Sequence, residues 1–344
     1  MSRLKSKSKF LKLYFLSRFF SHPTLNMGTI FVTRRCDRNC IYCYTKKNVD
    51  ANQELSTQES KEVIDKFNEF GVWYLAFYGG EPTLRSDLAD NIRYANNKGM
   101  FTIVHTNGSF KNIGIDEVVN AGIDVVDIAI DSITNPALKN YSEVKEKLER
   151  LIRTDVGVKL NHCITKENCD ETTKILWLTE HYKIPISIHL GESSPLPTNI
   201  NYDSTPFFKR GDKDDIQEVE KISRFLADRS RKSKLIINPP EYFEVWSRFI
   251  RGENLKWECK AGKSSLCIDY NGVVLSCVSA SSPINLDGNA LYYKDLNKSN
   301  INNVKQKIKE STLQCKSSCL SCTYMLENNS MMNIPRILKI VNSF

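Results

Sequence analysis

The sequence lacks several features that would place it in a special class of protein. Glycine and proline are few, with 15 and 11 among 344 residues, which argues against disordered and fibrous chains. No apolar run approaches the ~20 residues that a membrane-spanning helix needs. Acidic residues are missing from the first 20 positions, but beyond that segment the two signs of charge are close to balanced. The composition predicts a folded protein of enzyme size, and it does not support a basic footprint for nucleic acid.

Residues 1–27 form a basic and aromatic segment. No small-residue cleavage site follows its apolar positions, so it is not typical of a secretory signal peptide. Two interpretations stay open: a helix docked on the domain with solvated lysines, or an interfacial segment that touches a membrane surface or a partner groove. We therefore predict a cytoplasmic protein, with peripheral membrane contact through this segment as the alternative.

Cysteine is abundant, with eleven residues. The odd count and the missing secretory signal argue against a disulfide framework. Thiolates committed to metal in a reducing compartment are the better interpretation.

From residue 28 to about 193, short β-rich runs alternate with helical stretches. One such stretch, 56–71, begins with a capping box of Ser56 and Glu59 and stops at Gly71. The regular alternation predicts consecutive βα units and a parallel sheet covered on its outer face. The expected strands cover residues 28–35, 73–80, 101–108, 124–132, 158–165 and 186–193.

A connector at about 194–235, which ends in a charged helix, leads to a region of different texture. Six of the eleven cysteines lie beyond residue 257, and "CIDYNGVVLSC" (267–277) predicts a hairpin that turns on Asn271-Gly272. We predict three parts: residues 1–27, a core over 28–235, and a small metal-stapled module over 236–344.

Three cysteines directly follow the first expected strand, in "CDRNCIYCY" (36–44). They lie at the carboxyl edge of the sheet, where α/β folds place their active sites. A [4Fe-4S] cluster held by Cys36, Cys40 and Cys43 would leave one iron open, whereas structural zinc prefers four protein ligands. A zinc site with a fourth ligand from elsewhere is the alternative.

This spacing, with Tyr42 before the last cysteine, resembles the signature of the radical S-adenosylmethionine (SAM) enzymes. "YGGEP" (78–82), "HTNG" (105–108) and "IDS" (130–132) end the next strands where members of that family contact SAM. The resemblance covers about residues 28–193 and implies an α/β fold, a partial (β/α)6 TIM-like barrel followed by a small cysteine-rich module. The SAM-contacting residues that it implies are Tyr42, Gly79, Gly80, Glu81, Thr106, Asn107, Asp131, Ser132 and Asn161.

The chemistry of the glycines and of Glu81 suits contact with SAM. Glycines allow close approach of the backbone to the ligand, and Glu81 can accept hydrogen bonds from the amino group of SAM. Local backbone capping is the alternative for the later residues, because Asn, Asp, Ser and Thr cap routinely at strand-to-helix turns. Asn161 also lacks the clear fifth-strand motif of many family members.

The family's chemistry is the cleavage of SAM by one electron from the cluster. The 5′-deoxyadenosyl radical that results abstracts hydrogen from an unactivated carbon. The resemblance also implies a low-potential electron donor, such as ferredoxin or flavodoxin.

The second cysteine set resembles the auxiliary-cluster extension called SPASM or, in its shorter form, twitch. Twelve residues separate Cys259 from Gly272 and four separate Gly272 from Cys277, which fits that pattern, and Cys315, Cys319 and Cys322 follow. The resemblance implies one auxiliary [4Fe-4S] cluster on Cys259, Cys277, Cys319 and Cys322, with Cys315 as an alternative ligand. A structural zinc remains an alternative. Isolated cysteines are usually packed thiols, and we predict this for Cys163, Cys169 and Cys267.

The prediction for function is a radical SAM enzyme with an auxiliary cluster and an unidentified substrate. A peptide maturase working with a separate recognition protein and an enzyme acting on lipids are the alternatives within that class. A non-catalytic iron-sulfur or zinc protein is the alternative from another class, although none of the three cysteines nor Glu81 is missing.

Overall fold

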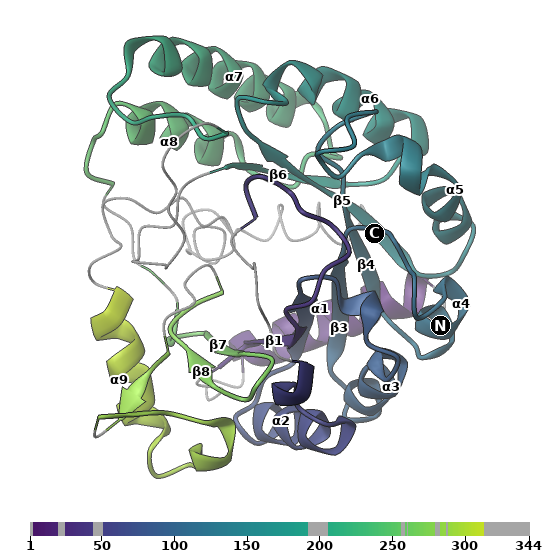
Figure 1. Cartoon of the computed structure of the whole chain (residues 1–344), viewed down its shortest axis with the longest axis vertical. Helices are drawn as coiled ribbons and strands as arrows, with labels where there is room; N and C mark the ends of the chain where they lie inside the picture. Colours follow the sequence, from purple (N-terminus) through teal and green to yellow (C-terminus); the bar gives the residue numbers. More distant parts are fainter. Residues whose placement is uncertain are drawn as a thin grey trace.

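The computed structural model of the protein (Figure 1) describes residues 3–19, 25–43, 51–191, 206–255, 259, 261–278, 283–286 and 288–312. Side chains of the N-terminal helix are described from 6 to 15. Cys315, Cys319 and Cys322 lie outside the described residues.

Six parallel strands form the centre of the molecule, in the spatial order β6-β5-β4-β3-β2-β1. Each consecutive strand adds beside the one before it, which is the order that successive βα units give. The strands coincide with the predicted runs, so the predicted α/β partial barrel is confirmed at this level. Their bounds are β1 Met27–Thr33, β2 Tyr74–Gly79, β3 Phe101–Thr106, β4 Val125–Ala129, β5 Gly157–Ile164 and β6 Ile186–Leu190.

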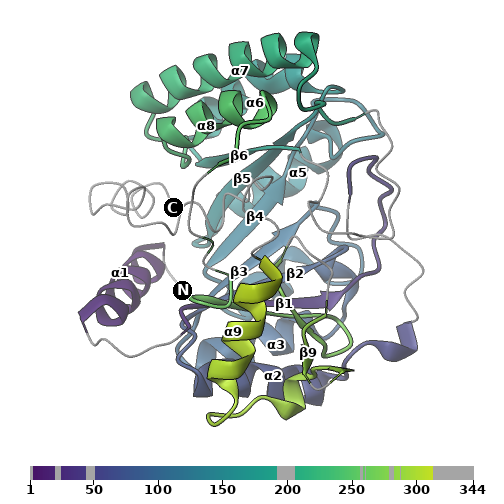
Figure 2. The ribbon, with the colours of Figure 1, turned by 90° about the vertical axis from the view of Figure 1, so that its left-hand side faces the viewer.

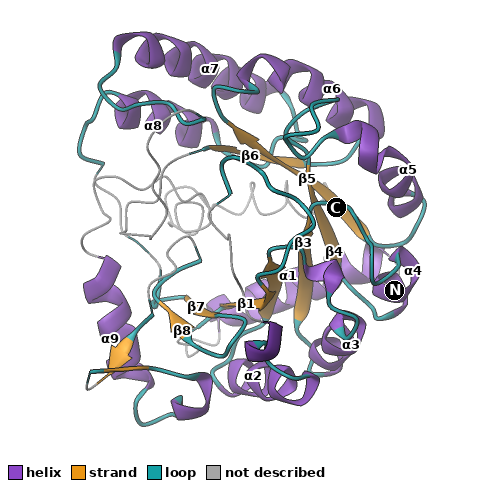
Figure 3. Ribbon diagram, viewed as in Figure 1, coloured by secondary structure: helices purple, strands orange, loops and turns teal. Residues whose placement is uncertain are grey.

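Helices cover the outer face of this sheet (Figure 3). The capping box predicted at Ser56 and Glu59 is present at the start of α2, and Gly71 follows its end with a φ of 80°. The helices are α2 Thr57–Glu69, α3 Leu88–Asn97, α4 Ile115–Asn120, α5 Tyr141–Ile152 and α6 Thr172–Tyr182, with short 3-10 helices at Ala51–Gln53, Pro82–Leu84 and Cys169–Glu171.

Two antiparallel helices follow β6 across the connector. The predicted charged helix is α7 (Lys213–Lys232), and it packs along α8 (Pro240–Ile250). Tyr242 and Trp246 of α8 are fully buried in the same hydrophobic core as the barrel strands. The hydrophobic core is therefore continuous across position 235/236. The division of the chain into two parts at this position stays a prediction.

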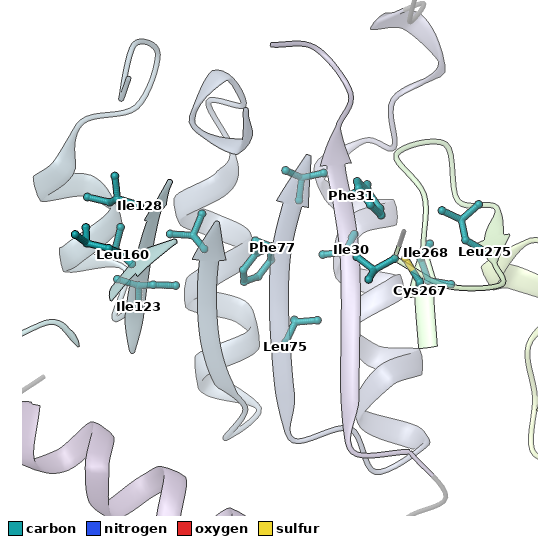
Figure 4. Close-up of a cluster of buried hydrophobic side chains, with 14 of the residues drawn as sticks. Ile30, Phe31, Leu75, Phe77, Ile123, Ile128, Leu160, Cys267, Ile268 and Leu275 are labelled. Carbon is teal, nitrogen blue, oxygen red and sulfur yellow. The ribbon is translucent and has the colours of Figure 1, made fainter. Parts of the chain in front are cut away.

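The predicted hairpin joins the edge of the barrel sheet. β7 (Ser265–Ile268) pairs with β1 in parallel and with β8 (Val274–Leu275) in antiparallel, and Gly272 in the turn has a φ of 87°. Cys267 lies opposite Thr29 of β1, and Figure 4 shows it beside Ile30 and Ile268. At 3% exposure it is a packed strand thiol, as predicted. The remaining elements are β9 Asn285–Leu286, β10 Asn289–Ala290, a 3-10 helix Tyr293–Asp295 and α9 Ile301–Thr312.

The N-terminal helix α1 (Arg3–Phe19) docks on the end of the sheet where the strands begin (Figure 2). Phe10 is buried in a cluster with Phe101, Ile103 and Val125, and its ring packs edge-on against Phe101 at 5.1 Å between centroids. Lys9 forms an ion pair with Asp124 at 2.8 Å. These contacts confirm the interpretation as a docked helix. Within the described part of the chain, no helix is both long and apolar enough to cross a membrane.

Candidate active site

The three-cysteine loop leaves β1 at the carboxyl edge of the sheet, as predicted. Cys36 is exposed, Cys43 is half-buried and Cys40 is 5% exposed, and all three are free thiols. The amide of Cys43 donates to the Cys40 carbonyl at 3.1 Å, and the amide of Arg38 donates to Cys36 Sγ at 3.4 Å. Local turns of the backbone thus hold the thiols within one short segment.

Ion pairs fix the start of this loop. Arg34 donates to both carboxylate oxygens of Asp269, at 2.7 and 3.0 Å, and Arg35 donates to both oxygens of Glu54, at 2.9 Å each. Bidentate arginine pairs are directional as well as strong. The first pair ties the loop to the β7–β8 hairpin, which lies more than 200 positions further along the chain.

Two of the thiols hold their protons more tightly than an ordinary cysteine. Desolvation of the thiol raises the pKa of Cys36 to about 11, although the hydrogen bond from the Arg38 amide opposes the shift, and desolvation also raises the pKa of Cys40. A metal therefore has to displace these protons when it binds.

The donor set fits a cluster with an open iron. Three free thiols within eight positions supply three ligands, and the exposed Cys36 leaves access from solvent. Among the described residues, no three Cys, His, Asp or Glu side chains are grouped closely enough to hold a metal ion. The thiols would draw together on binding.

Glu81 follows β2 and organises the strand ends around it. Its carboxylate is fully buried and accepts hydrogen bonds from the amide and hydroxyl of Thr83, the hydroxyl of Thr106 and the amide of Asn107, at 2.7 to 3.0 Å. Burial raises the pKa of Glu81, while these hydrogen bonds favour its charged form. The expected contact with the SAM amino group stays a prediction, since four protein donors already surround the carboxylate.

Gly79 and Gly80 have a packing reason of their own. A Cβ at Gly79 would lie 2.5 Å from the Thr33 carbonyl oxygen, and one at Gly80 would lie 2.3 Å from that of Arg35. The end of β2 is thus pressed against the start of the cysteine loop, where Gly80 and Glu81 donate their amides to Thr33 and Arg35. The sequence indicated that these glycines allow close approach of the backbone, and they do, but the segment that comes close is the start of the cysteine loop. Contact of these glycines with a ligand remains a prediction.

Asn107 links β3 to the cysteine loop. Its Nδ2 donates to Asp37 Oδ1 at 2.8 Å and lies 3.8 Å from Cys36 Sγ. Lys111 pairs with the same Asp37 at 3.1 Å. Thr106 and Asn107 are both buried and both contact Glu81, so these three predicted residues lie together.

A second group surrounds Asp131 after β4. The Tyr42 hydroxyl donates to Asp131 Oδ2, and the Cys163 amide donates to Oδ1 at 2.6 Å. Lys139 lies 3.5 Å from Asp131 and 5.2 Å from the centroid of the Tyr42 ring. Burial by itself would raise the pKa of Asp131, but Lys139 and other partners hold it below its usual value. Asp131 caps no described helix, so the capping alternative is wrong for this residue.

Ser132 and Asn161 differ from this group. Ser132 is fully buried and donates to Glu171 at 2.9 Å, which anchors the start of α6 rather than opening toward a ligand. Asn161 is half-buried on β5, opposite Ala129 of β4. Their predicted contacts with SAM stay predictions.

Cys163 lies nearer to the cysteine loop than the sequence suggested. It is half-buried, and it packs with Cys43 against the buried cluster of Cys40, Tyr42 and Leu138. Cys163 is a packed thiol, as predicted, but it is only half-buried and contacts the cysteine-loop cluster, because β5 turns its odd-numbered side chains toward this region. Cys169 is half-buried and packs against the main core.

A cavity of about 420 Å³ flanks the cysteine loop on its other side. It lies between residues 37–40, the turns after β3 and β4, and the first turns of α5. Charged side chains, including Lys111, Glu143 and Lys147, line it. Of the second cysteine set, Cys259 and Cys277 are half-buried and pack against the main core.

Comparison with known proteins agrees with this geometry. Residues 30–175 match the family described as the radical SAM superfamily. The chain is 33% identical to the Fe-coproporphyrin III synthase of Methanosarcina barkeri over 162 residues. The aligned residues cover 45% of this chain and 41% of that protein. It is 28% identical over 204 residues to a probable GTP 3',8-cyclase of Metallosphaera sedula, covering 56% of this chain and 63% of that one. The chain thus spans less than two thirds of these relatives.

Solved structures share the fold at low sequence identity. Native anSMEcpe with bound AdoMet superposes with a TM-score of 0.62 at 13% identity, over 92% of this chain and 99% of that one. Streptococcus suis SuiB superposes with a TM-score of 0.64 at 12% identity, over 88% and 71%. The match to the radical SAM superfamily over residues 30–175 thus coincides with the part of the chain that carries the cysteine loop at the carboxyl edge of the parallel sheet.

Proposed function

We propose that the protein is a radical SAM enzyme that cleaves SAM reductively and abstracts a hydrogen atom from its substrate. The observation that carries the proposal is the three free thiols of Cys36, Cys40 and Cys43 in the loop after β1, beside the polar groups around Glu81 and Asp131, which follow β2 and β4. When bound, the cluster would supply the electron that cleaves SAM.

The chain's own residues would position the reactants and exclude water. Glu81 fixes Thr106 and Asn107, and Asn107 in turn holds Asp37 of the cysteine loop. Tyr42 and Lys139 hold Asp131 at the opposite side of the loop. Because each group is locked by a neighbour, the ligand would bind to a prearranged surface.

The auxiliary cluster is a second part of the proposal. Cys259 and Cys277 would supply two of its ligands, with Cys319 and Cys322, or Cys315 in place of one of them. Cys259 and Cys277 pack against the core that carries β7, beside β1. Four thiolates would close the cluster, so it would transfer electrons rather than bind substrate. A low-potential protein such as ferredoxin or flavodoxin would supply the first electron.

Iron content and SAM cleavage test the proposal together. Anaerobic protein should contain two [4Fe-4S] clusters and should release 5′-deoxyadenosine when reduced. Replacing Cys36, Cys40 and Cys43 by Ala should remove about half of the iron and sulfide and all of the 5′-deoxyadenosine, on the ligand count above. The Cys267→Ala variant is the matched control, since Cys267 is a packed strand thiol. Unchanged iron in the triple variant would refute the cluster assignment.

A further inference from the structure

A row of polar side chains crosses the face of the sheet that is turned away from α2–α6. In the strand register His105 of β3 lies opposite Asp127 of β4, and Asp127 lies opposite Lys159 of β5. Tyr78 of β2 stacks on His105 at 4.0 Å between ring centroids, and Ser187 of β6 accepts a hydrogen bond from Lys159 at 2.7 Å. The row therefore runs across five strands without interruption.

The row lies between an apolar floor and the candidate active site. Two residues before Tyr78, His105 and Asp127 on their strands are Ala76, Ile103 and Val125, which pack against Phe10 of α1. Because side chains alternate along a strand, both sets lie on one face. Two residues after His105 is Asn107, which contacts the cysteine loop. A ligand entering from the cysteine-loop end would meet this row before it reached the floor.

The contacts within the row fix its hydrogen-bonding capacity. His105 Nδ1 and Lys159 Nζ lie 2.7 and 2.8 Å from the same oxygen, Oδ2 of the fully buried Asp127. A carboxylate at this distance holds the imidazole with its proton on Nδ1, which leaves Nε2 as an acceptor. Lys159 Nζ donates a hydrogen bond to Ser187 and forms an ion pair with Asp127, so these two partners occupy at most two of its three N–H groups.

One hydrogen-bond acceptor and one donor remain available at the surface of the row. Among the described residues, none is bonded to His105 Nε2 or to the third Lys159 proton, and the two side chains are 18% and 13% exposed. One acceptor and one charged donor side by side match a group that both gives a proton and takes a hydrogen bond. A hydroxyl does both, whereas an ammonium has no lone pair for Lys159 and a carboxylate has no proton for His105.

We propose that His105, Asp127 and Lys159 form the subsite that receives a hydroxyl group of the substrate, with His105 Nε2 as its proton acceptor. This rests on the proposed function, which places the reacting molecule in the same chamber. The O–H bond breaks, the proton moves to Nε2, and the imidazolium pairs with Asp127. The electron pair stays on the substrate oxygen, which Lys159 stabilises, so the step is neither an oxidation nor a reduction.

The charges around the row keep His105 ready to accept. Burial lowers the pKa of His105, and the facing Asp127 offsets part of that shift while Lys159 adds to it. Burial likewise lowers the pKa of the neighbouring His189 to about 3. Lys159 and His105 hold Asp127 charged, with its pKa well below the usual value, although burial opposes the shift. Both histidines are therefore neutral at neutral pH.

Carbethoxylation by diethylpyrocarbonate tests whether His105 is a reachable, neutral base. The full-length, cluster-loaded protein is treated anaerobically, and each histidine peptide is quantified by mass spectrometry. His181 on the surface and the fully buried His162 are internal references within the same sample. His105 should react, with a rate that is half-maximal below pH 6.5, the ordinary value of a histidine. Reactivity as low as that of His162 would refute the proposal.

Small probes distinguish the class of group that is bound. Glycerol should slow the modification of His105 by about twofold or more relative to His181, and sodium acetate at the same concentration should not. Protection by acetate alone, or by neither probe, would refute the hydroxyl assignment. SAM cleavage by untreated protein is measured separately, so its failure would refute the proposed function and leave the result on His105 standing.

Two variants assign the effect to the row. Asp127→Asn should slow the modification of His105 by about fivefold or more, because the amide no longer fixes the Nδ1 proton. Asp116→Asn, which changes an exposed carboxylate on α4, should leave it unchanged. Lys159→Met should abolish the protection by glycerol, and retained protection would contradict the role of Lys159. If Asp127→Asn does not fold, the pH dependence and the probes still decide the outcome.

Discussion

The two ends of the partial barrel are built from opposite materials. Where the strands begin, Phe10 of α1 seals the sheet with an apolar cluster of Ala76, Phe101, Ile103 and Val125. Where they end, Glu81, Asn107 and Asp131 form polar networks with the cysteine loop. Burial of apolar area at the first end stabilises the folded protein, whereas burial of charged groups at the second end costs folding free energy.

This difference teaches where stability and function are separable. Loss of a side chain at the sealed end should change the free energy of unfolding with little change in chemistry. Loss at the open end should change the chemistry more than the stability, because partners are shared within each network. The predictions below, from the largest effect to the smallest, compare the two ends directly.

Glu81→Gln should have the largest effect. An amide at this position places N–H groups against four donors, so the arrangement of Thr106 and Asn107 is lost. We expect 5′-deoxyadenosine formation to fall by about 1,000-fold, or about 4 kcal/mol in the activation barrier. Glu69→Gln, on the exposed side of α2, is the matched control. Activity close to wild type would show that the Glu81 network is structural only.

Phe10→Ala should test the sealed end. Removing a ring that packs against Phe101 and Trp73 should lower the free energy of unfolding by about 3 kcal/mol, measured by denaturant titration. SAM cleavage by the protein that remains folded should change by less than about twofold. Phe225→Ala, at a partly exposed position on α7, provides the comparison for a ring outside the core. A loss of activity larger than the loss of folded protein would mean that the two ends are coupled.

The ion pair between Arg34 and Asp269 should make an intermediate contribution to the free energy of unfolding. A double-mutant cycle with Arg34→Met and Asp269→Asn should give a coupling energy of about 1.5 kcal/mol, because both side chains are largely buried and the contact is bidentate. The exposed pair Arg150–Asp116 should give less than about 0.5 kcal/mol in the same measurement. Equal coupling in the two cycles would refute a special role of the first pair in fixing the loop.

Tyr42→Phe should have the smallest effect. It removes one hydrogen bond to Asp131, which keeps its contacts with Lys139 and the Cys163 amide. We expect the KM for SAM to rise by about threefold to fivefold, equivalent to about 1 kcal/mol. Tyr94→Phe loses a comparable bond to Asp65 on the surface and should leave KM unchanged. An identical KM in the two variants would separate Tyr42 from ligand binding.

Much of the barrel could be predicted because its signals are local. The six strands are runs of apolar residues, and α2 starts and stops at residues whose capping chemistry can be recognised within a few positions. The three cysteines are likewise local, since their spacing lies within one loop. Signals of this kind do not depend on which strands become neighbours.

The networks around the site could not be predicted because they depend on register. The bond from Tyr42 to Asp131 joins the loop after β1 to the turn after β4, and the Asp127 contacts need β3, β4 and β5 aligned at one level. The glycines of "YGGEP" were recognisable as positions of close approach, but only the packed strands reveal that Thr33 and Arg35 are what they approach. The displaced position of Cys163 follows from the same alignment of β5.

The pairing of β7 with β1 also constrains the order of assembly. Ser265 has to find Met27, so this edge of the sheet stays unsatisfied while most of the chain is being synthesised. The Asp269 partner of Arg34 arrives with the same hairpin. The contacts of Arg35 with Glu54 can form early, whereas the contact of Arg34 with Asp269 can form only after the hairpin has been synthesised, so the start of the cysteine loop reaches its final arrangement late in folding.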